Sequence, residues 1–217
     1  YGYDALQWLD RDALHERVRC DRYLGGILDP GGGHLHPLNY TLGLARAAQQ
    51  AGARLHEQSA VLSLDRGKKI SVRTTQGAVQ ADFAVLAGNA HLGDALVPEL
   101  RGKVMPIGNY IAATEPLSDA QVARTLPQND AVADANFVLD YYHLSADQRM
   151  LYGGFVSYGK HPPRRLRARM AAKLGRLFPA LAGVRMAYQW EGTVGITYNR
   201  APHLGRIGDN LFFLQGY

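Results

Sequence analysis

The sequence predicts an α+β fold, with a mixed α/β layer up to residue 100 and an antiparallel β-sheet backed by helices after it. The 217 residues are 47% apolar and 20% charged, which is ordinary for a globular chain with one large core or two small ones. Helix-like and strand-like segments alternate before residue 100, whereas longer strand-like runs follow it. This change of pattern predicts two domains.

The part before residue 100 is expected to alternate between helix and strand. Pro37 is suited to the first turn of a helix, and Gly52 is a typical C-terminal stop. Turn residues separate three short alternating runs, and the last apolar run does not alternate, as in a strand covered on both faces. We therefore expect a helix at residues 1–22, a strand at 23–28, a helix at 37–52, a strand at 53–57, a three-stranded meander at 61–83 and a buried strand at 84–87.

The part after residue 100 is expected to form the antiparallel sheet. Its strands are predicted at residues 104–114, 137–143, 150–157 and 184–191. A basic helix is expected after Pro162-Pro163, because apolar residues recur there at helical spacing, at Leu166, Met170, Leu174 and Leu177 or Phe178. We interpret its arginines as a solvated face. The alternative is a surface that docks an acidic partner or nucleic acid.

Composition limits the compartment and the partners. The single cysteine, Cys20, cannot form an internal disulfide, so a reducing compartment and a cytoplasmic location are expected. No run of apolar residues is long enough for a membrane span, and no Cys/His cluster has metal-ligand spacing. The net charge of +5 comes largely from the basic helix, and no nucleic-acid-binding motif accompanies it. We expect no metal, no membrane and no nucleic-acid partner.

The ends of the sequence predict an excerpt of a longer protein. The first residue is Tyr1 in place of Met, and residues 211–217 are typical of a strand that runs into a glycine turn. The glycine clusters at 25–26 and 31–33 match neither the dinucleotide fingerprint nor the P-loop, so we interpret them as turns. No serine nucleophile elbow is present either, which leaves hydrolase chemistry without local support.

Aromatic residues and glycines gather in the predicted sheet. They lie at Tyr110, Asp140–Tyr142, Tyr152–Phe155, Tyr158-Gly159 and Trp190. Tyrosines on strands more often pack the sheet than bind a substrate, so packing is the competing interpretation. Strand alternation places Asp140 and Tyr142 on one face and Tyr141 on the other.

The ordered series of motifs resembles the D-amino-acid oxidase-like FAD oxidoreductases. The series runs through Asp29–Pro37, Gly43–Ala45, Ala51–Ala53, Ser59–Val61, Val85–Ala90, Pro202–Gly205 and Gln215–Tyr217. Each motif is weak alone, but the order covers nearly the whole chain. Within the family, the chain is most similar to a branch that acts on polyamine-derived amines, through Gly33–Asn39, Ala87–Asp94, Leu139–Tyr142 and Leu151–Gly154.

The resemblance implies a domain plan and a cofactor. Residues 1–22 would be a linker helix of the substrate domain, 23–100 a partial FAD-binding domain, 101–197 the substrate-binding sheet domain, and 198–217 a return to the FAD-binding domain. The family's pyrophosphate-binding loop would precede Tyr1, and a flavin-side motif would follow Tyr217. We therefore expect the chain alone to bind no FAD and to be inactive.

The resemblance also implies which residues contact non-covalent FAD. Val61 would lie beside the adenine, and Ala87, Gly88 and Asn89 would line the phosphate or ribose side. Pro202, Gly205, Gly216 and Tyr217 would approach the isoalloxazine. Glycine suits this role because a backbone without Cβ can come close to a ligand. The sarcosine-oxidase branch attaches its flavin through a cysteine, and no cysteine follows Cys20 here.

The substrate implied by the resemblance is a small amine. Tyr110, Asp140, Tyr142, Phe155 and Trp190 would bind it, with Asp140 and Glu191 as candidate partners for a cationic end. Amino-acid oxidases of the family carry an arginine just after the segment that corresponds to Trp190–Gly192, and residues 193–196 contain none. We therefore expect oxidation of an amine C–N bond to an imine and then an aldehyde, with O2 as the acceptor. No individual catalytic residue is assigned. The alternatives are an amino-acid oxidase or dehydrogenase and a non-catalytic amine-binding module.

Overall fold

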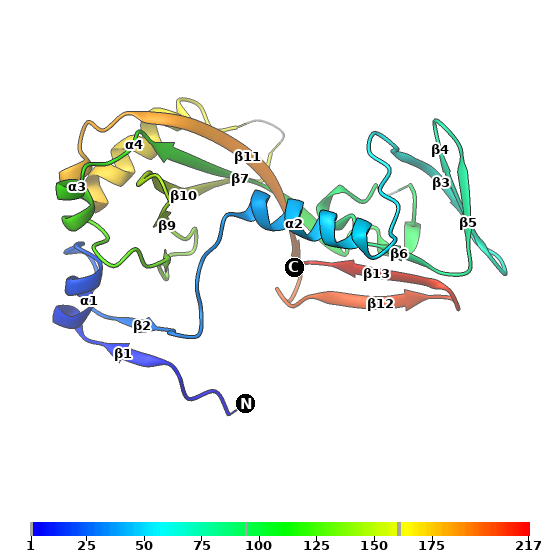
Figure 1. Ribbon diagram of the computed structural model, residues 1–217, viewed down its shortest axis with the longest axis horizontal. Coiled ribbons are helices and arrows are strands. Elements are labelled where there is room, and N and C mark those ends of the chain that lie inside the picture. The colour runs from blue at the N-terminus through cyan, green and yellow to red at the C-terminus, as the bar shows by residue number, and fades with distance from the viewer. Residues whose placement is uncertain (1, 94, 160–161) are drawn as a thin grey trace. The chain divides into compact units, whose positions relative to one another are not determined.

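The computed structural model describes residues 2–93, 95–159 and 162–217 (Figure 1). The chain forms two compact units, the first made of Tyr1–Thr41 with Asn109–Glu191 and the second of Leu42–Gly108 with Gly192–Tyr217. Both contain antiparallel strands and few helices, which confirms the α+β class. The sequence-based domain boundaries at residues 22, 100 and 197 differ from these. The assignment of FAD binding and substrate binding to particular domains stays a prediction.

The first unit contains a five-stranded sheet in the order β11-β7-β10-β9-β8. Tyr142 lies opposite Tyr152 in the antiparallel β9–β10 pair, and Val132 lies opposite Tyr142 in the β8–β9 pair. The strands are β7 (Val104–Thr114), β8 (Val132–Ala133), β9 (Tyr141–Leu144), β10 (Met150–Ser157) and β11 (Met186–Thr197), of which β7 and β11 continue into residues of the second unit.

Helix α4 (Leu166–Leu177) packs on this sheet through its apolar face, as the sequence predicts (Figure 1). Leu166, Met170, Leu174 and Leu177 are all buried, and they join the sheet in one hydrophobic core. Phe178 follows the last residue of the helix and is also buried. Leu177 and Phe178, which the sequence offered as alternatives for the last apolar position, therefore both belong to the core. A short 3-10 helix, Pro179–Leu181 (η3), follows.

Two sequence-based expectations in the first unit are wrong. Residues 1–22 are not one helix: β1 (Gln7–Leu9) pairs with β2 (Gly26–Leu28), and the helix α1 (Arg11–Arg17) begins only after Asp10, whose carboxylate accepts a hydrogen bond from the Ala13 amide. The strand expected at 137–143 begins at Tyr141. The Asp134 carboxylate accepts hydrogen bonds from the amides of Asn136 and Asp140, which bends the preceding residues into a loop.

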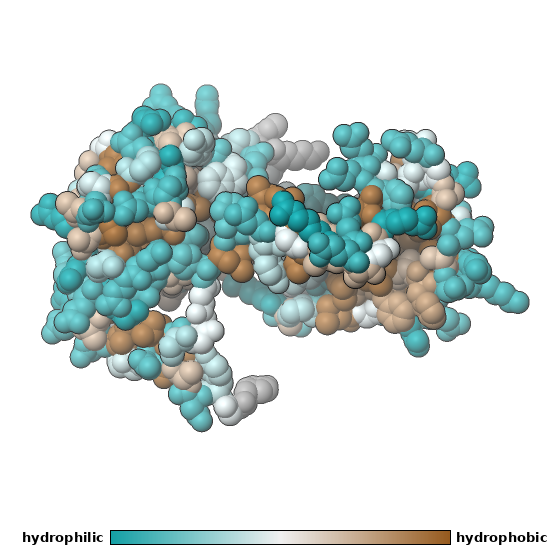
Figure 2. All heavy atoms as spheres, viewed as in Figure 1, coloured by the Kyte–Doolittle hydropathy of each residue, from teal (hydrophilic) through white to brown (hydrophobic). Residues whose placement is uncertain are grey.

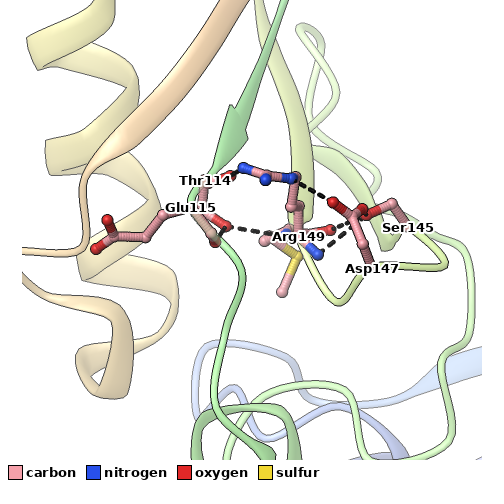
Figure 3. A network of polar contacts seen from close by, with 6 residues as sticks. Thr114, Glu115, Ser145, Asp147 and Arg149 are labelled. Carbon is pink, nitrogen blue, oxygen red and sulfur yellow. Dashed lines mark hydrogen bonds and ion pairs between the residues drawn. The ribbon is translucent and has the colours of Figure 1, made fainter.

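A polar clamp holds the β9–β10 turn against the end of β7 (Figure 3). The Arg149 guanidinium lies 2.6 Å from the Asp147 carboxylate and also donates to the carbonyl oxygen of Thr114 at 3.1 Å. The Ser145 hydroxyl donates to Asp147, and this bond together with Arg149 lowers the pKa of the Asp147 carboxyl. On the other side of Thr114, Glu115 pairs with Arg185 at 3.2 Å. Helix α3 (Asp119–Ala123) follows with a complete capping box.

The second unit contains two three-stranded sheets. One is the predicted meander β3 (Val61–Asp65), β4 (Ile70–Thr74) and β5 (Ala78–Ala81). The other has the order β12-β13-β6, with β6 (Ala84–Leu86) parallel to β13 (Leu211–Gln215) and β12 (His203–Ile207) antiparallel to it. Two short 3-10 helices, Asn89–His91 (η1) and Pro98–Leu100 (η2), lie between β6 and β7. Ile70, Val97, Leu100, Leu211 and Phe213 form the core.

Two further expectations fail in this part of the chain. Residues 53–57 form no strand, because they are exposed and pair with no other strand of the described chain. The run 84–87 does form β6, but it is only half-buried, because β6 lies at the edge of its sheet within the described residues.

Helix α2 (Pro37–Gln50) forms where it is expected, yet it buries none of its residues. Leu38 is 60% exposed and Leu42 is 44% exposed. On the face of the molecule shown in Figure 2, apolar residues accordingly lie among polar ones at the surface. Within the described residues, no helix combines the length and the apolar character needed to cross a membrane.

The glycine-rich segment after β2 is held by side-chain contacts. The Gly31 amide donates to the Asp29 carboxylate at 2.9 Å, and the Tyr3 hydroxyl also donates to that carboxylate. Further along, the His34 ring lies 4.4 Å from the His143 ring and bonds the carbonyl oxygen of Asn129 at 3.0 Å. Burial lowers the pKa of His143, and the neighbouring His34 lowers it further, although a hydrogen bond with the Leu144 carbonyl opposes both effects.

The lowered pKa of His143 makes the free energy of unfolding depend on pH. Because the folded-state pKa of His143 lies below its ordinary value of 6.5, protonation favours the unfolded chain, so stability falls as the pH drops below about 6.5. We expect His143→Gln to lose less of its unfolding free energy than the parent between about pH 7 and about pH 5 in urea titrations. His56→Gln, an exposed control, should behave like the parent. Equal losses in all three proteins would contradict this account.

Candidate functional site

The carboxyl ends of two parallel strands meet in the second unit. In the β6–β13 pair, Ala84 lies opposite Leu211 and Leu86 opposite Phe213, so both strands end at the same edge. Strand β12 starts at this edge, because His203 lies opposite Gln215. Ligands of α/β proteins bind beyond the carboxyl ends of parallel strands. We call the residues at these strand ends the carboxyl edge: Ala87, Gly88, Asn89, Pro202, Gly216 and Tyr217.

Asn89 joins the two strand ends. Its side-chain oxygen accepts a hydrogen bond from the Gly216 amide at 2.9 Å, and its amide nitrogen lies 3.5 Å from the Tyr217 carbonyl oxygen. The Tyr217 hydroxyl donates back to the carbonyl oxygen of Ala87 at 3.1 Å. Asn89 has a φ of 44°, a left-handed conformation that asparagine tolerates better than most residues. The sequence-predicted cofactor residues after β6 and after β13 are therefore in direct contact.

Two glycines are required for this packing. Gly216 has a φ of 72°, and a Cβ placed on it would lie 2.2 Å from the Cγ2 of Thr197. A Cβ on Gly195 would lie 2.4 Å from the Asn89 side-chain oxygen. The two glycines thus let backbone segments of the edge approach closely, and none of its six residues carries a carboxylate side chain.

Two predicted cofactor residues lie away from the carboxyl edge. Gly205 lies within β12 opposite Phe213, where a Cβ would be 2.5 Å from the phenyl ring. Val61 begins β3 in the other sheet and is 42% exposed. A role in binding FAD stays a prediction for these two residues, as it does for the six of the edge.

Sequence reasoning missed the residues that support the edge. The Thr197 hydroxyl donates to the Ala201 carbonyl at 2.7 Å, and its methyl group fills the space beside Gly216. Gln215 is buried, and its side-chain amide lies 2.8 Å from the His203 ring nitrogen. A polar residue at the end of an apolar strand, as in residues 211–215, is the sequence signal for Gln215. Nothing in the sequence distinguishes Thr197.

Asp140, a predicted substrate residue, lies in the core of the first unit. It is fully buried, and its Oδ1 accepts hydrogen bonds from the Tyr152 hydroxyl at 2.6 Å and from the Lys173 ammonium at 2.6 Å. Its Oδ2 is buried and has no partner among the residues that the structure describes. Lys173 therefore balances the charge of this carboxylate within the unit itself.

The predicted tyrosines are also core residues. Tyr142 is 2% exposed, and its hydroxyl donates to that of Tyr23 at 3.0 Å; Tyr110 is 3% exposed. Burial raises the pKa of Tyr23 to about 12, and burial also raises the pKa values of Tyr142 and Tyr152. These phenols remain protonated at neutral pH, so they serve as neutral hydrogen-bonding groups and not as bases.

The two remaining substrate residues are more accessible. Phe155 is half-buried, whereas Trp190 is 43% exposed and lies outside the core cluster. The structure thus brings Tyr110, Asp140, Tyr142 and Phe155 into one region of the first unit. None of them lines the cavity of about 540 Å³ that lies among α1, β2 and β8 in the described chain. Substrate binding by these five residues stays a prediction.

In the described part of the chain, no group of three or more His, Cys, Asp or Glu residues could hold a metal ion.

The contact between Gly216 and Thr197 yields a stability prediction with a matched control. Gly216 and Gly208 both have positive φ values, 72° and 65°, but a Cβ on Gly208 would meet nothing within 4 Å. We expect Gly208→Ala to cost about 1 kcal/mol of unfolding free energy through backbone strain alone. Gly216→Ala should cost about 1–3 kcal/mol more, because the methyl group also overpacks Thr197. Equal costs in urea titrations would show that the contact relaxes freely.

The buried Asp140 carboxylate yields a second prediction. Lys173→Met leaves this charge unpaired, and we expect a loss of about 3 kcal/mol of unfolding free energy, at the lower end of the range for such pairs because the Lys173 side chain is 22% exposed. Adding Asp140→Asn removes the unpaired charge and should restore part of the loss. If the double variant is no more stable than Lys173→Met, the charge is not the cause.

The fold has close counterparts among solved structures. Glycine oxidase from Geobacillus kaustophilus superposes with a TM-score of 0.82 and 22% sequence identity, over 99% of this chain and 58% of that one. L-proline dehydrogenase from P. horikoshii gives a TM-score of 0.81 with 20% identity, over 97% of this chain and 59% of that one. At this level of identity, the similarity shows the fold.

Curated relatives match along the entire chain. Gamma-glutamylputrescine oxidoreductase of Escherichia coli is 42% identical over 217 residues, which are 100% of this chain and 51% of that protein. A probable oxidoreductase, OrdL, of Haemophilus influenzae is 37% identical over 100% of this chain and 50% of its own length. D-amino acid dehydrogenase of Cereibacter sphaeroides is 28% identical over 88% of this chain and 43% of its own length. The chain spans about half the length of these relatives.

A family model that matches the entire chain shows the family. The model of the FAD dependent oxidoreductase family, DAO, matches residues 1–217. This match confirms the resemblance drawn from the ordered motifs, and it makes FAD the cofactor of the family. The chain belongs to the DAO family of FAD-dependent oxidoreductases.

Proposed function

We propose that the full-length protein oxidises the C–N bond of a small primary or secondary amine similar to gamma-glutamylputrescine, and that it yields an imine which water hydrolyses to an aldehyde. The 42% identity with gamma-glutamylputrescine oxidoreductase over the whole chain carries this proposal. The similarity to D-amino acid dehydrogenase is lower, at 28% over 88% of the chain.

The segment after Trp190 supports an amine over an amino acid. Residues 193–196 are Thr-Val-Gly-Ile, so no guanidinium is available there for the bidentate binding of a substrate carboxylate. These residues lie in β11, and Trp190 and Glu191 just before them are exposed. The exposed Glu191 is one candidate for the cationic end of a polyamine-like substrate. Asp140 is the other, although Lys173 already pairs with it.

The carboxyl edge is where this chain would hold FAD. Backbone groups of Ala87, Gly88, Asn89, Gly216 and Tyr217 meet there, and the hydrogen bonds of Asn89 fix their positions. When bound, FAD supplies the acceptor for the two electrons and the hydrogen of the amine C–H bond, and O2 would then take these electrons to give hydrogen peroxide. The contribution of the chain is to orient the substrate and to exclude water from the neutral amine.

A cytoplasmic location also stays a prediction. The free cysteine, Cys20, is buried, which is compatible with a reducing compartment.

An anaerobic flavin-bleaching screen with the FAD-loaded full-length protein tests the proposal. Gamma-glutamylputrescine and putrescine form the amine arm, and glycine, L-proline and D-alanine form the amino-acid arm. We expect the amines to reduce the flavin at least about tenfold faster than the amino acids, a difference of about 1.4 kcal/mol in activation free energy. A peroxidase-coupled assay in air then reports whether O2 accepts the electrons.

The outcomes separate the three candidate functions. Faster bleaching by amino acids would establish an amino-acid oxidase or dehydrogenase. Tight amine binding without any bleaching would establish a binding module. Bleaching by amines without peroxide in air would keep the amine substrate and exclude O2 as the acceptor.

A further inference from the structure

A basic cavity lies between helix α4 and strand β10 in the first unit. Its volume is about 430 Å³, and it is lined by Phe155, Arg169, Ala172, Lys173 and Arg176. The four helical residues fall on one face of α4, because their spacing of three, four and seven places them above one another. Phe155 of β10 lies beneath them, with its ring centroid 5.1 Å from the Arg169 guanidinium and 5.5 Å from the Lys173 ammonium.

Two of the three cations have no acidic partner in the described chain. Lys173 pairs with Asp140 at 2.6 Å, but no carboxylate of the described residues forms an ion pair with Arg169 or Arg176. Other arginines of the same unit are paired: Arg17 with Asp130 at 2.8 Å, and Arg149 with Asp147 at 2.6 Å (Figure 3). What distinguishes Arg169 and Arg176 is that they line one cavity with Lys173, above the ring of Phe155.

Like charges at these helical spacings repel one another, so the arrangement is unfavourable until an anion enters. The apolar ring of Phe155 displaces water below the cations, which strengthens their interaction with an anion. The cavity volume lies in the range of small-molecule sites. Arg169 and Arg176 are two helical turns apart, about 10 Å along the axis, which matches an elongated ligand better than a single ion.

We propose that this cavity binds a small elongated anion with a carboxylate or phosphoryl group at each end, held by Arg169 and Arg176. Lys173 lies between them and contacts both the cavity and Asp140. Arg169 and Arg176 are exposed, so the cavity opens to solvent. Arg164, Arg165 and Arg167 are also exposed, but they line no part of the cavity. The cavity shares Phe155 with the predicted substrate residues, whereas Arg169 and Arg176 are not among them.

Isothermal titration of the FAD-loaded full-length protein with two probes tests the site. Adipate serves as the carboxylate probe and fructose 1,6-bisphosphate as the phosphoryl probe, because each carries an anionic group at both ends of an elongated molecule. Stronger binding of one identifies the preferred group. The bound flavin keeps the bisphosphate from the cofactor site. We expect saturable binding, and we expect Arg169→Gln/Arg176→Gln to raise the dissociation constant at least about tenfold.

The matched control removes the same charge from the same segment. Arg164→Gln/Arg167→Gln should leave the dissociation constant within about twofold of the parent, because neither residue lines the cavity. Flavin bleaching by amines should be unchanged in both variants, which separates this test from that of the proposed function. Equal weakening in both variants, or equal loss of duplex DNA binding in both, would show a non-specific polyanion surface and overturn the proposal. Absence of probe binding to the parent would overturn it as well.

Discussion

The first unit depends on the burial of one charge. Asp140 immediately precedes β9 and has no exposed surface, and Lys173 of α4 forms an ion pair with it. A buried carboxylate is tolerated only where a cation and hydrogen-bond donors surround it, so the position of α4 on the sheet and the order of the Asp134–Asp140 loop are both constrained by this requirement. The apolar face of α4 packs on the sheet, and the ion pair requires the helix to lie where Lys173 can reach Asp140.

Periodic patterns predicted the elements whose burial is decided locally. The apolar spacing in α4 and the lengths of β7 and β10 were predicted correctly, because each has one face on a core. The helix expected throughout residues 1–22 failed, because Trp8 and Ile27 face each other in a strand pair that no local pattern reveals. The strand expected at 53–57 failed for a related reason: an alternating segment becomes a strand only when another strand is there to pair with it.

At the candidate site too, local motifs predicted which residues matter, whereas contacts between distant segments could not be predicted. The ordered motifs marked Gly88 and Gly216, and at Gly216 the physical reason is the contact with Thr197, which leaves no room for a Cβ. The contacts between Asn89 and Gly216 join segments far apart in the chain, and the motifs predicted that both lie near the cofactor but not that they bond each other. Thr197 and Lys173 were missed because their importance comes only from what they touch: Thr197 the Cβ position of Gly216, Lys173 the carboxylate of Asp140.

The buried side chains of Tyr142 and Tyr152 separate these core tyrosines chemically from the tyrosines at the surface. Reagents that attack the phenolate, such as those used for nitration or iodination, need a ring that is accessible and able to ionise. Tyr158 and Tyr198 at the surface, 62% and 105% exposed, meet the first condition, whereas the core tyrosines meet neither while the unit is folded. Labelling of the core tyrosines would therefore record opening of the first unit, and surface labelling would supply the internal reference.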